Sequence, residues 1–492
     1  MATAATLAVV YPHMTGLGGD GFWLISVPDQ EPIAIDACGV AATSADLAFY
    51  RGQHLKEIPW RGPLAANTVA GTVAGWRAAL ELSARWSPRM PLACLLEDAV
   101  SYAENGIVVT ASQAELTRLR LGDLRDVPGF AENYLGAGQA PRQGEILKQQ
   151  ALGSTLRKLA QAGLDDFYRG QLAFSMAADL RRAGSPLAVE DLRGYHATIT
   201  KPLSVRIKGA TLFNFPPPTQ GLASLMILAM FERLGVREAE TFEHVHSMVE
   251  ATKQAFLIRD REIGDPSQMT REPAAFLSPA LLDSLAERID GSKAMPWPAH
   301  PSGGDTVWLG VADNKGRMVS FIQSLYFEFG SGVVLPETGI VWQNRGSAFR
   351  CVEDGPNALK PGYKPFHTLN PAMTHFDDGR RMAYGTMGGD GQPQFQSAIF
   401  SRYAFFGQGL QEAITRPRWL LGRLWGEEST TLKLEIRFES EMVDALKTAG
   451  HDVELLEPFS SKVGHAGAIV VSGEGLLEGA ADPRSDGAVA AW

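Results

Sequence analysis

The stretch GGDTVWLGVADNKGRMVSF, residues 303–321, decides the fold that we expect for this chain of 492 residues. Mostly apolar residues fill 307–311 and 318–321, and a polar Asp-Asn-Lys-Gly turn separates them. Apolar runs around a tight turn predict a pair of antiparallel strands. The strand pattern does not explain Asp305 and Thr306, which follow two glycines at the start of the first strand.

Thr306 is a candidate nucleophile that would carry its own base. A threonine hydroxyl is a weak nucleophile, but when Thr becomes the first residue of a chain its α-amine can take up the proton. The ordinary pKa of that amine, about 7.7 to 8.0, suits proton transfer near neutral pH. Residues 294–304 (AMPWPAHPSGG) are rich in Pro and Gly and predict the exposed linker that self-cleavage before Thr306 requires. Taken alone, Asp-Thr before a strand also fits a cap or a turn.

A second cluster, TMGGDGQPQ at 386–394, follows the predicted strand 382–386. Gly388 and Gly389 could present consecutive backbone N–H groups to a developing oxyanion, because glycine permits close approach and unusual dihedral angles. An ordinary β-turn explains the same letters. The two clusters nevertheless point to one chemistry, acyl transfer.

Composition narrows the class of protein. The chain has 45 Lys and Arg against 55 Asp and Glu, a formal charge of −10, and no block of like charges, so nothing suggests a nucleic acid or an anionic membrane as partner. No stretch reaches about 18 uninterrupted apolar residues. Three cysteines without CxxC spacing predict no disulfide framework.

We expect a cytoplasmic protein. An Ala-rich helix at 1–11 starts without a cap, so we also expect N-terminal residues to be missing, and an exported form stays open.

The order of the predicted elements indicates an α+β fold. Helical periodicity dominates from about 69 to 234, and strand signals dominate from Thr306 onward. A helix-rich part followed by a strand-rich part suggests helices that cover stacked sheets. The predicted helices include 1–11, 92–106, 172–185 and 222–234, and the predicted strands are 22–27, 203–207, 210–215, 307–312, 317–324, 339–343, 382–386 and 467–472.

Two further motifs favour structural explanations. GLGGDG at 16–21 precedes a strand and lacks a GK[ST] ending, so it predicts a tight turn in place of a phosphate loop. His244 and His246 lie two residues apart on a predicted helix, where they do not share a face, and the sequence there makes no HExxH motif. We expect no metal and no cofactor.

With these motifs in hand, the chain resembles the γ-glutamyltranspeptidase family over nearly its whole length. The ordered matches are VVYPHMTGLGGDGFWL (9–24), AANTVAGTVAGW (65–76), FYRG (167–170) through EDLRGYHA (190–197), FNFPPPTQG (213–221), REIGDP (261–266), DTVWLGVADNKGRMVSF (305–321), FGSGVVLPETGIVWQN (329–344), GGDGQPQ (388–394) and GAADPRSDG (479–487).

The resemblance implies an N-terminal nucleophile hydrolase fold, a four-layer αββα sandwich that forms as one precursor and then cuts itself. The cut would fall between Asp305 and Thr306 and give a large segment, 1–305, and a small segment, 306–492. The partners are then these two segments and a small amide substrate, and a homo-oligomer of such heterodimers is compatible with the sequence.

The resemblance also implies roles for individual residues. Thr306 matches the nucleophile, Ser324 matches a second hydroxyl that hydrogen-bonds it, and Gly388 and Gly389 match the oxyanion-hole glycines. Thr306 would attack an amide carbonyl, an amine or ammonia would leave, and water or an acceptor amine would resolve the ester.

The departures from the family pattern lie in the group of residues that grips a glutamyl substrate. Where the family has an Arg, IDACGVAAT (35–43) has none, and Cys38 aligns best. The family's Asp corresponds to Ala348, its serine pair to His367 and Thr368, and its Asn to Tyr326, while Arg345 stands where the family often has Gln. This loss of the glutamyl grip resembles the family's divergent amidohydrolases. If the alignment holds, Arg345 predicts a site for a substrate carboxylate, with Tyr326, His367 and Thr368 beside it; pairing of Arg345 with a structural carboxylate is the alternative.

Three functions stay open at this point. The first is an autoprocessing amidohydrolase or acyltransferase that acts on a small carboxylate-bearing amide, similar to oxamate amidohydrolases or cephalosporin acylases. The second is a true γ-glutamyltransferase or glutathione hydrolase. The third is a family member that stays uncut and has no catalytic activity.

Overall fold

Two large β-sheets form the centre of the molecule. The structure is a computed structural model, and it describes residues 1–86, 90–297, 305–422 and 429–491. The first sheet contains, in spatial order, β5 (Thr198–Thr200), β2 (Ile33–Ala37), β1 (Asp20–Ser26), β9 (Met318–Tyr326) and β8 (Asp305–Ala312). The second contains β16 (Leu477–Ala481), β15 (Ala466–Val471), β11 (Arg381–Thr386), β10 (Ala372–Phe376), β7 (Ala210–Asn214) and β6 (Leu203–Ile207).

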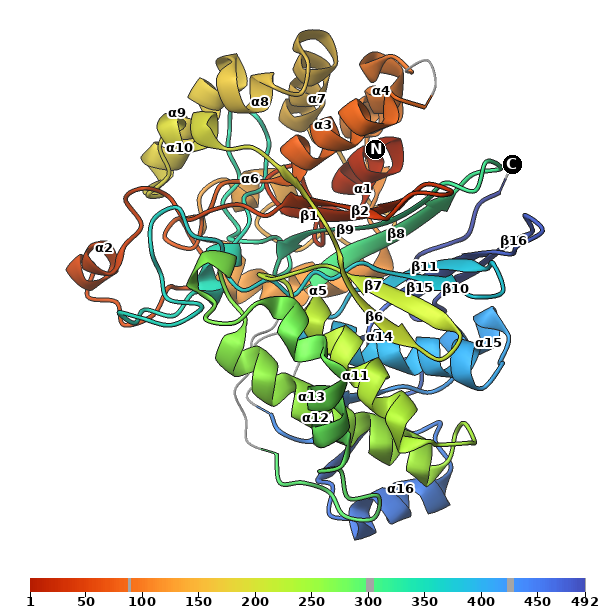
Figure 1. Ribbon diagram of the computed structural model, residues 1–492. Coiled ribbons are helices and arrows are strands. Elements are labelled where there is room, and N and C mark those ends of the chain that lie inside the picture. Colours follow the sequence, from red (N-terminus) through yellow and green to blue (C-terminus); the bar gives the residue numbers. More distant parts are fainter. Residues whose placement is uncertain (87–89, 298–304, 423–428, 492) are drawn as a thin grey trace.

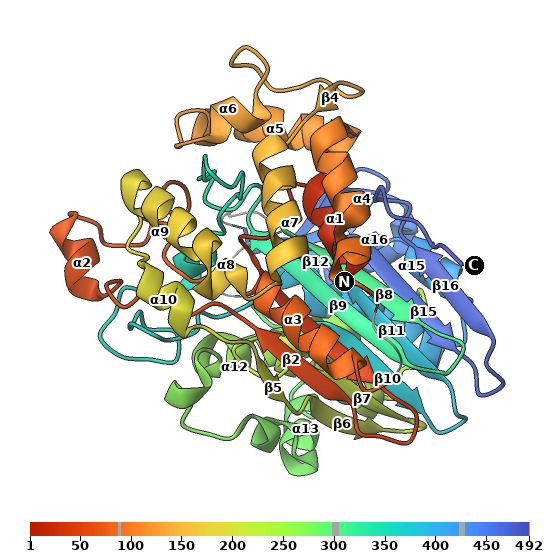
Figure 2. The same cartoon turned by 90° about the horizontal axis from the view of Figure 1, so that it is seen from above.

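The two sheets pack face to face, and alternation along the strands decides which side chains meet between them. On β1, Phe22 and Leu24 join a core that includes Phe213 and Met373 of the second sheet, whereas Trp23 joins a separate core. Successive side chains of a strand point to opposite faces, so each strand serves two cores. In Figure 2 the strands of both sheets lie along much the same direction, as in an aligned packing.

One group of helices covers the outer face of the first sheet, above the strands in Figure 1. It consists of α1 (Ala2–Val10), α3 (Thr72–Ser83), α4 (Leu92–Asn105), α7 (Gln150–Ala162), α8 (Asp166–Arg169), α9 (Gln171–Ala183) and α10 (Val189–Gly194). Helix α2 (Leu47–Gly52) contributes Tyr50 to the same core but lies to the left of the strands in Figure 1. Beside them, α5 (Ala111–Leu124) and α6 (Phe130–Tyr134) pack around Leu325 and Phe329.

A second group covers the outer face of the second sheet, below the strands in Figure 1. It consists of α11 (Gly221–Leu234), α12 (Phe242–Glu262), α13 (Pro279–Ala286), α14 (Gln392–Phe400), α15 (Leu410–Thr415) and α16 (Ser440–Thr448). Helix α11 is apolar around most of its circumference because it lies between the sheet and α12. Helix α12 begins at Thr241, whose hydroxyl accepts a hydrogen bond from the backbone N–H of His244.

The remaining elements are short. Strands β12 (Trp419–Leu421), β13 (Leu432–Glu435) and β14 (Val453–Leu456) form a small third sheet, and β3 (Ile107–Val108) pairs with β4 (Ile146–Leu147). One-turn helices occupy Pro266–Gln268, Pro273–Leu277, Arg345–Ala348, Gly389–Gly391, Ser401–Phe405 and Ser461–Val463. Within the described ranges, no helix is long and apolar enough to cross a membrane.

Most of the predicted elements are present, with one clear error. The strands predicted at 203–207, 210–215, 307–312 and 382–386 correspond to β6, β7, β8 and β11, and α11 lies where 222–234 predicts it. The predicted strand 339–343 is wrong, because Val341 and Trp342 make only isolated bridges, to Val334 and Gly18. Loops surround this apolar stretch, so no neighbouring strand is available to form a ladder.

The predicted linker 294–304 falls largely outside the described residues, since 298–304 lie in one of the gaps. Its described part differs from the prediction. Ala294 is buried, and Met295 and Trp297 are half-buried, so this end of the linker is not an exposed tether.

Candidate functional site

Thr306 lies at an irregularity where β8 meets β9. Asp305 pairs with Tyr326, yet Val307 pairs with Gln323, so two residues of β9 stand opposite Thr306. One of those two is Ser324. A local bulge re-aims side chains and is frequent beside active sites. The register therefore brings the two hydroxyl residues of the predicted site to the same point.

The side chain of Thr306 faces the second sheet. Trp308, two residues further along β8, belongs to the core between the sheets, and side chains two apart share a face. Thr306 is 2% exposed. Among the described residues, no group is within hydrogen-bonding distance of its Oγ1. A buried hydroxyl without a partner is costly, which makes Thr306 stand out as a functional position.

Ser324 and Tyr326 form a strained corner at the end of β9. The Oγ of Ser324 accepts a hydrogen bond from the backbone N–H of Tyr326 at 2.8 Å. Tyr326 has a φ of 86°, a conformation that a bulky side chain rarely adopts. Strain of this kind gathers at active sites. The corner turns the chain directly opposite Asp305.

The glycine loop after β11 adopts backbone conformations that only glycine takes up readily. Gly388 has a φ of 122° and Gly389 a φ of 48°, and both are buried. A Cβ on Gly388 would lie 2.7 Å from the ring of Phe395, so a larger residue does not fit. Within the part of the chain that the structure describes, neither backbone N–H donates a hydrogen bond. The two groups are thus free to bind an anionic oxygen.

Arg345 is a buried cation with unused hydrogen-bond donors. Its Cζ lies 3.5 Å from the centroid of the Tyr326 ring, and its Nη2 donates to Oγ1 of Thr368 at 3.1 Å. Arg345 is 1% exposed. Its Nε and Nη1 have no acceptor among the described residues. A planar guanidinium with free N–H groups fits a carboxylate.

A chain of hydrogen bonds joins Arg345 to the glycine loop. Thr368, which accepts from Arg345, has its carbonyl oxygen 2.8 Å from Nε2 of Gln220. The same Nε2 donates to the carbonyl oxygen of Gly389 at 2.7 Å. Arg259 in turn donates to Oε1 of Gln220 at 3.0 Å. The predicted cation site and the predicted oxyanion loop are therefore parts of one rigid network.

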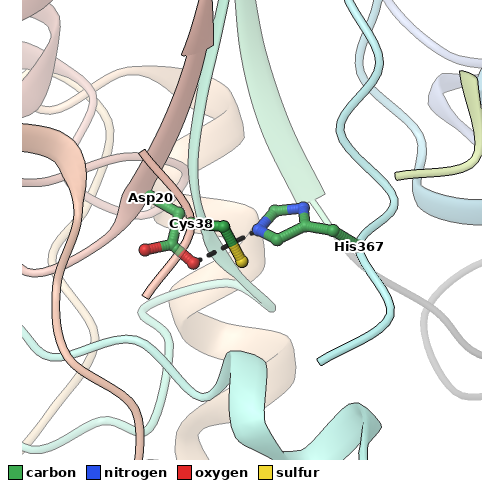
Figure 3. Close-up of side chains that lie close together, drawn as sticks. All are labelled: Asp20, Cys38 and His367. Atoms are coloured by element: carbon green, nitrogen blue, oxygen red, sulfur yellow. Dashed lines mark hydrogen bonds and ion pairs between the residues drawn. The ribbon is translucent and has the colours of Figure 1, made fainter. Parts of the chain in front are cut away.

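Asp20 and His367 form a buried pair beside Arg345, with Cys38 next to them (Figure 3). Nε2 of His367 lies 3.2 Å from Oδ2 of Asp20, and Nδ1 of His367 accepts from the backbone N–H of Leu369. Because Nδ1 is an acceptor, Nε2 must carry the proton and donate it to Asp20. Oδ1 of Asp20 accepts from Gln343 and from the backbone N–H groups of two glycines.

Burial controls protonation in this cluster. It raises the pKa of Asp20 to about 7, although the hydrogen bonds from Gln343 and the two glycines and the charge of Arg345 act in the opposite direction. Burial, with a smaller effect of Arg345, holds the pKa of His367 well below its ordinary value, so the pair is a hydrogen bond to a neutral imidazole. Burial also raises the pKa of Cys38 well above the ordinary value. The thiol stays protonated and does not compete with Thr306 as a nucleophile.

Two groups of side chains bring metal-binding atom types together, Asp20 with Cys38 and His367, and His246 with Glu250 and His451. In the first group both oxygens of Asp20 already accept hydrogen bonds, the thiol is protonated, and Arg345 adds a positive charge. In the second group the carboxylate accepts from an ammonium group and from a backbone amide. Neither donor set fits a cation.

The predicted substrate-binding residues lie close together in the structure, but they also contact one another and Asp20. Tyr326 and Arg345 stack, and Thr368 binds Arg345, whereas His367 is occupied by Asp20. Their predicted contact with substrate stays a prediction. Asp20 and Gln220 were not singled out from the sequence. The signal for Asp20 is its acidic side chain at the first position of a fully buried strand. Asp20 belongs to the motif GLGGDG, which was interpreted only as a turn.

Comparison with known proteins identifies the family of the chain. The family model described as Gamma-glutamyltranspeptidase matches residues 1–492. The chain belongs to the gamma-glutamyltranspeptidase family. It is 55% identical to the oxamate amidohydrolase proenzyme of Klebsiella pneumoniae subsp. pneumoniae over 493 residues, which cover 100% of this chain and 93% of that protein. It is 40% identical to the glutathione hydrolase-like YwrD proenzyme of Bacillus subtilis, with 99% of this chain and 92% of that protein covered.

The gamma-glutamyltranspeptidase relatives of known structure share the fold. The cephalosporin acylase from Bacillus halodurans superimposes with a TM-score of 0.90 at 32% identity, and the match covers 100% of this chain and 90% of that one. The predicted family, the mixed α+β fold and the hydrolase class are confirmed. These relatives carry the names of amidohydrolases, glutathione hydrolases and acylases.

Proposed function

We propose that this protein is a self-cleaving amidohydrolase whose nucleophile is Thr306 and whose substrate is a small amide that carries a carboxylate, such as oxamate. The observation that carries the proposal is Arg345, a buried guanidinium with two donor atoms, Nε and Nη1, that have no acceptor among the described residues. Arg345 stacks on Tyr326, whose backbone pairs with Asp305. A carboxylate bound to Arg345 would thus lie near the nucleophile.

The proposed catalytic cycle uses these groups in turn. The Thr306 oxygen attacks the amide carbonyl, its proton passes to the α-amine of Thr306, and the N–H groups of Gly388 and Gly389 bind the oxyanion. When the intermediate collapses, the C–N bond breaks and the amine returns a proton to the departing ammonia. Water then cleaves the ester, which releases the acid and restores the hydroxyl.

The same hydroxyl would first cut the chain. It attacks the carbonyl carbon of Asp305, and the peptide nitrogen of Thr306 leaves and gains a proton, which gives an ester. Hydrolysis of that ester leaves a carboxylate on Asp305 and a free amine on Thr306.

The proposed cut divides the chain into segments 1–305 and 306–492, which together make one domain. We also propose the four-layer αββα arrangement of N-terminal nucleophile hydrolases. The two facing sheets, each with a helical cover on its outer side, support it. The cut would place the new N-terminal Thr at the start of β8, at the edge of the first sheet.

Protein sequencing tests the nucleophile directly. The purified protein should give two bands on a denaturing gel, one with an N-terminus that reads Thr-Val-Trp-Leu, and Thr306→Ala should give one inactive band. A new terminus at another position, or one full-length band from the wild type, would refute the assignment and favour a family member without activity.

Release of ammonia from primary amides, and of glutamate from glutathione, tests the substrate class. We expect oxamate to be hydrolysed faster than glutamine, glutathione or a glutaryl amide, because the family's Arg for a glutamyl group is replaced by Cys38. Efficient release of glutamate from glutathione would instead favour a γ-glutamyl hydrolase.

A further inference from the structure

A buried row of charged side chains on α12 holds the chain segment that leads into the cleavage linker. The Nζ of Lys253 donates to Oε1 of Glu250 and to the carbonyl oxygen of Met295, both at 2.7 Å. The backbone N–H of Met295 donates to Oε2 of Glu250 at 3.1 Å. The two charged side chains are each 2% exposed. Both polar groups of the Met295 backbone are thus fixed by one helix.

Further hydrogen bonds hold the segment just before Met295, and they come from residues on both sides of the proposed cut. The Nε2 of His246 lies 2.8 Å from the carbonyl oxygen of Asp290, so this nitrogen carries the proton, and Nδ1 accepts from Nε2 of His451 at 2.9 Å. The backbone N–H of Ala294 donates to the carbonyl oxygen of Ala449 at 2.8 Å. His451 and Ala449 follow α16, in the segment that begins at Thr306.

A buried ion pair of this kind is a poor way to stabilise a fold. Removing two charges from water costs about as much as their attraction returns, and apolar residues of similar volume often replace such a pair without loss. What the pair provides here is a defined position for the backbone of Met295. Further along the same helix, Arg259 contacts Gln220 and Asp390 at the glycine loop. One rigid helix therefore connects the start of the linker with the candidate active site.

We propose that Glu250 and Lys253 are positioning residues for self-cleavage, which fix the upstream end of the linker so that the Asp305 carbonyl meets the Thr306 hydroxyl. This inference rests on the proposed cleavage between Asp305 and Thr306. Ten residues separate Met295 from Thr306. Without the contacts to Met295, the segment is held only further from Thr306, at Ala294 and Asp290, so the direction in which the chain continues towards Asp305 is less defined.

The test is the rate of self-cleavage in a cell-free synthesis reaction, followed on denaturing gels after synthesis is stopped. The variant Glu250→Met with Lys253→Met removes both contacts to Met295 and leaves no unpaired charge. We expect its precursor to cleave more slowly than the wild type, while the fraction that has been cut shows the wild-type kcat and KM for oxamate. A merely structural role would lower the thermal midpoint and kcat and leave the cleavage rate unchanged.

The matched control is a second buried carboxylate that holds a distant loop. Asp179 pairs with Arg182 on α9 and accepts from the backbone N–H of Glu337 at 3.0 Å. Asp179→Met with Arg182→Met should cleave at the wild-type rate. The loop variant Met295→Pro, which removes one backbone donor without altering α12, should slow cleavage as the α12 variant does.

The outcomes separate the two proposals. Equal cleavage rates in the wild type, the α12 variant and Met295→Pro would overturn the positioning role and leave the proposed function intact. A wild-type precursor that never cleaves would overturn the proposed function and this inference with it. Slow cleavage in the control as well would show that the loss of any buried carboxylate that holds a loop has this effect, and would also overturn the inference.

Discussion

The contacts of Arg345 give the strongest argument for a substrate that carries a carboxylate. It is buried against Tyr326, donates to Thr368 and leaves Nε and Nη1 without acceptors among the described residues. In Arg345→Lys the positive charge stays but the planar fork is lost. We expect kcat/KM for oxamate to fall by about 10- to 100-fold, because hydrogen bonds to a charged group contribute about 1.5–3 kcal/mol. Steady-state kinetics would check this, and unchanged kcat/KM would exclude a substrate contact.

Asp20 predicts a pH dependence of anion binding. Its pKa is raised to about 7 by burial, so below that pH the carboxyl is neutral and above it a negative charge stands near Arg345. The inhibition constant of a small unreactive carboxylate should therefore rise with pH through about 7. We expect a change of about tenfold between pH 6 and 9, which corresponds to ~1.4 kcal/mol of repulsion between partly buried charges.

Asp20→Asn separates this effect from the α-amine of Thr306, which also loses its charge in that range. His367 and Cys38 do not change charge there, since burial lowers the pKa of the first and raises that of the second. The dependence should become shallower in Asp20→Asn. An identical slope in the variant would mean that Asp20 is not the responsible group.

At the scale of elements, the two sheets approach closely where glycines make room for Trp308. A Cβ on Gly385 of β11 would lie 2.1 Å from the Trp308 ring, and one on Gly467 of β15 would lie 2.6 Å from it. The indole of β8 thus lies directly on two strands of the facing sheet. This contact sets the distance between β8, which begins with Asp305 and Thr306, and the facing sheet, whose strand β11 leads into the glycine loop.

Gly385→Ala should therefore destabilise the protein by about 1–3 kcal/mol, as overpacking of a filled core does. Thermal unfolding would show a lower midpoint. Gly122→Ala on α5, where an added Cβ meets nothing within 4 Å, is the control and should be neutral or stabilising, since Ala favours a helix. Equal midpoints for Gly385→Ala and the wild type would mean that the sheets can shift apart.

At the scale of the whole molecule, the proposed large and small segments share both sheets. In the first sheet, Asp20–Ser26 pairs with Met318–Ser324 across β1 and β9. In the second, β7 pairs with β10. The core between the sheets takes side chains from both segments. Cleavage at one peptide bond removes none of these contacts.

The cut protein should therefore elute from a sizing column as one species that contains both fragments. Denaturant should be needed to separate them, because each sheet loses its central pairing when one segment leaves. Sizing chromatography with gel analysis of the peak would check this. Fragments that separate in buffer alone would contradict the shared sheets.

The sequence by itself determined the family and most of the elements, and it predicted the nucleophile. Short motifs such as Asp305-Thr306 and Gly388-Gly389 are local, and alternation fixes which face of a strand is buried, so β6, β7, β8 and β11 could be predicted from neighbouring residues alone. The short strands β2, β10 and β16 were missed, because each is a strand only through its partners.

Only the tertiary structure decided the electrostatics of the site. The pairing of Asp20 with His367 joins residues more than 300 positions apart, and the stacking of Arg345 on Tyr326 joins residues about 20 positions apart. That Nε and Nη1 of Arg345 have no acceptor among the described residues is likewise a property of the packed chain. The predicted strand 339–343 failed for a related reason, since its backbone bridges to loops in place of a sheet. Burial and partner choice depend on the whole packed chain, and no local pattern of residues carries that information.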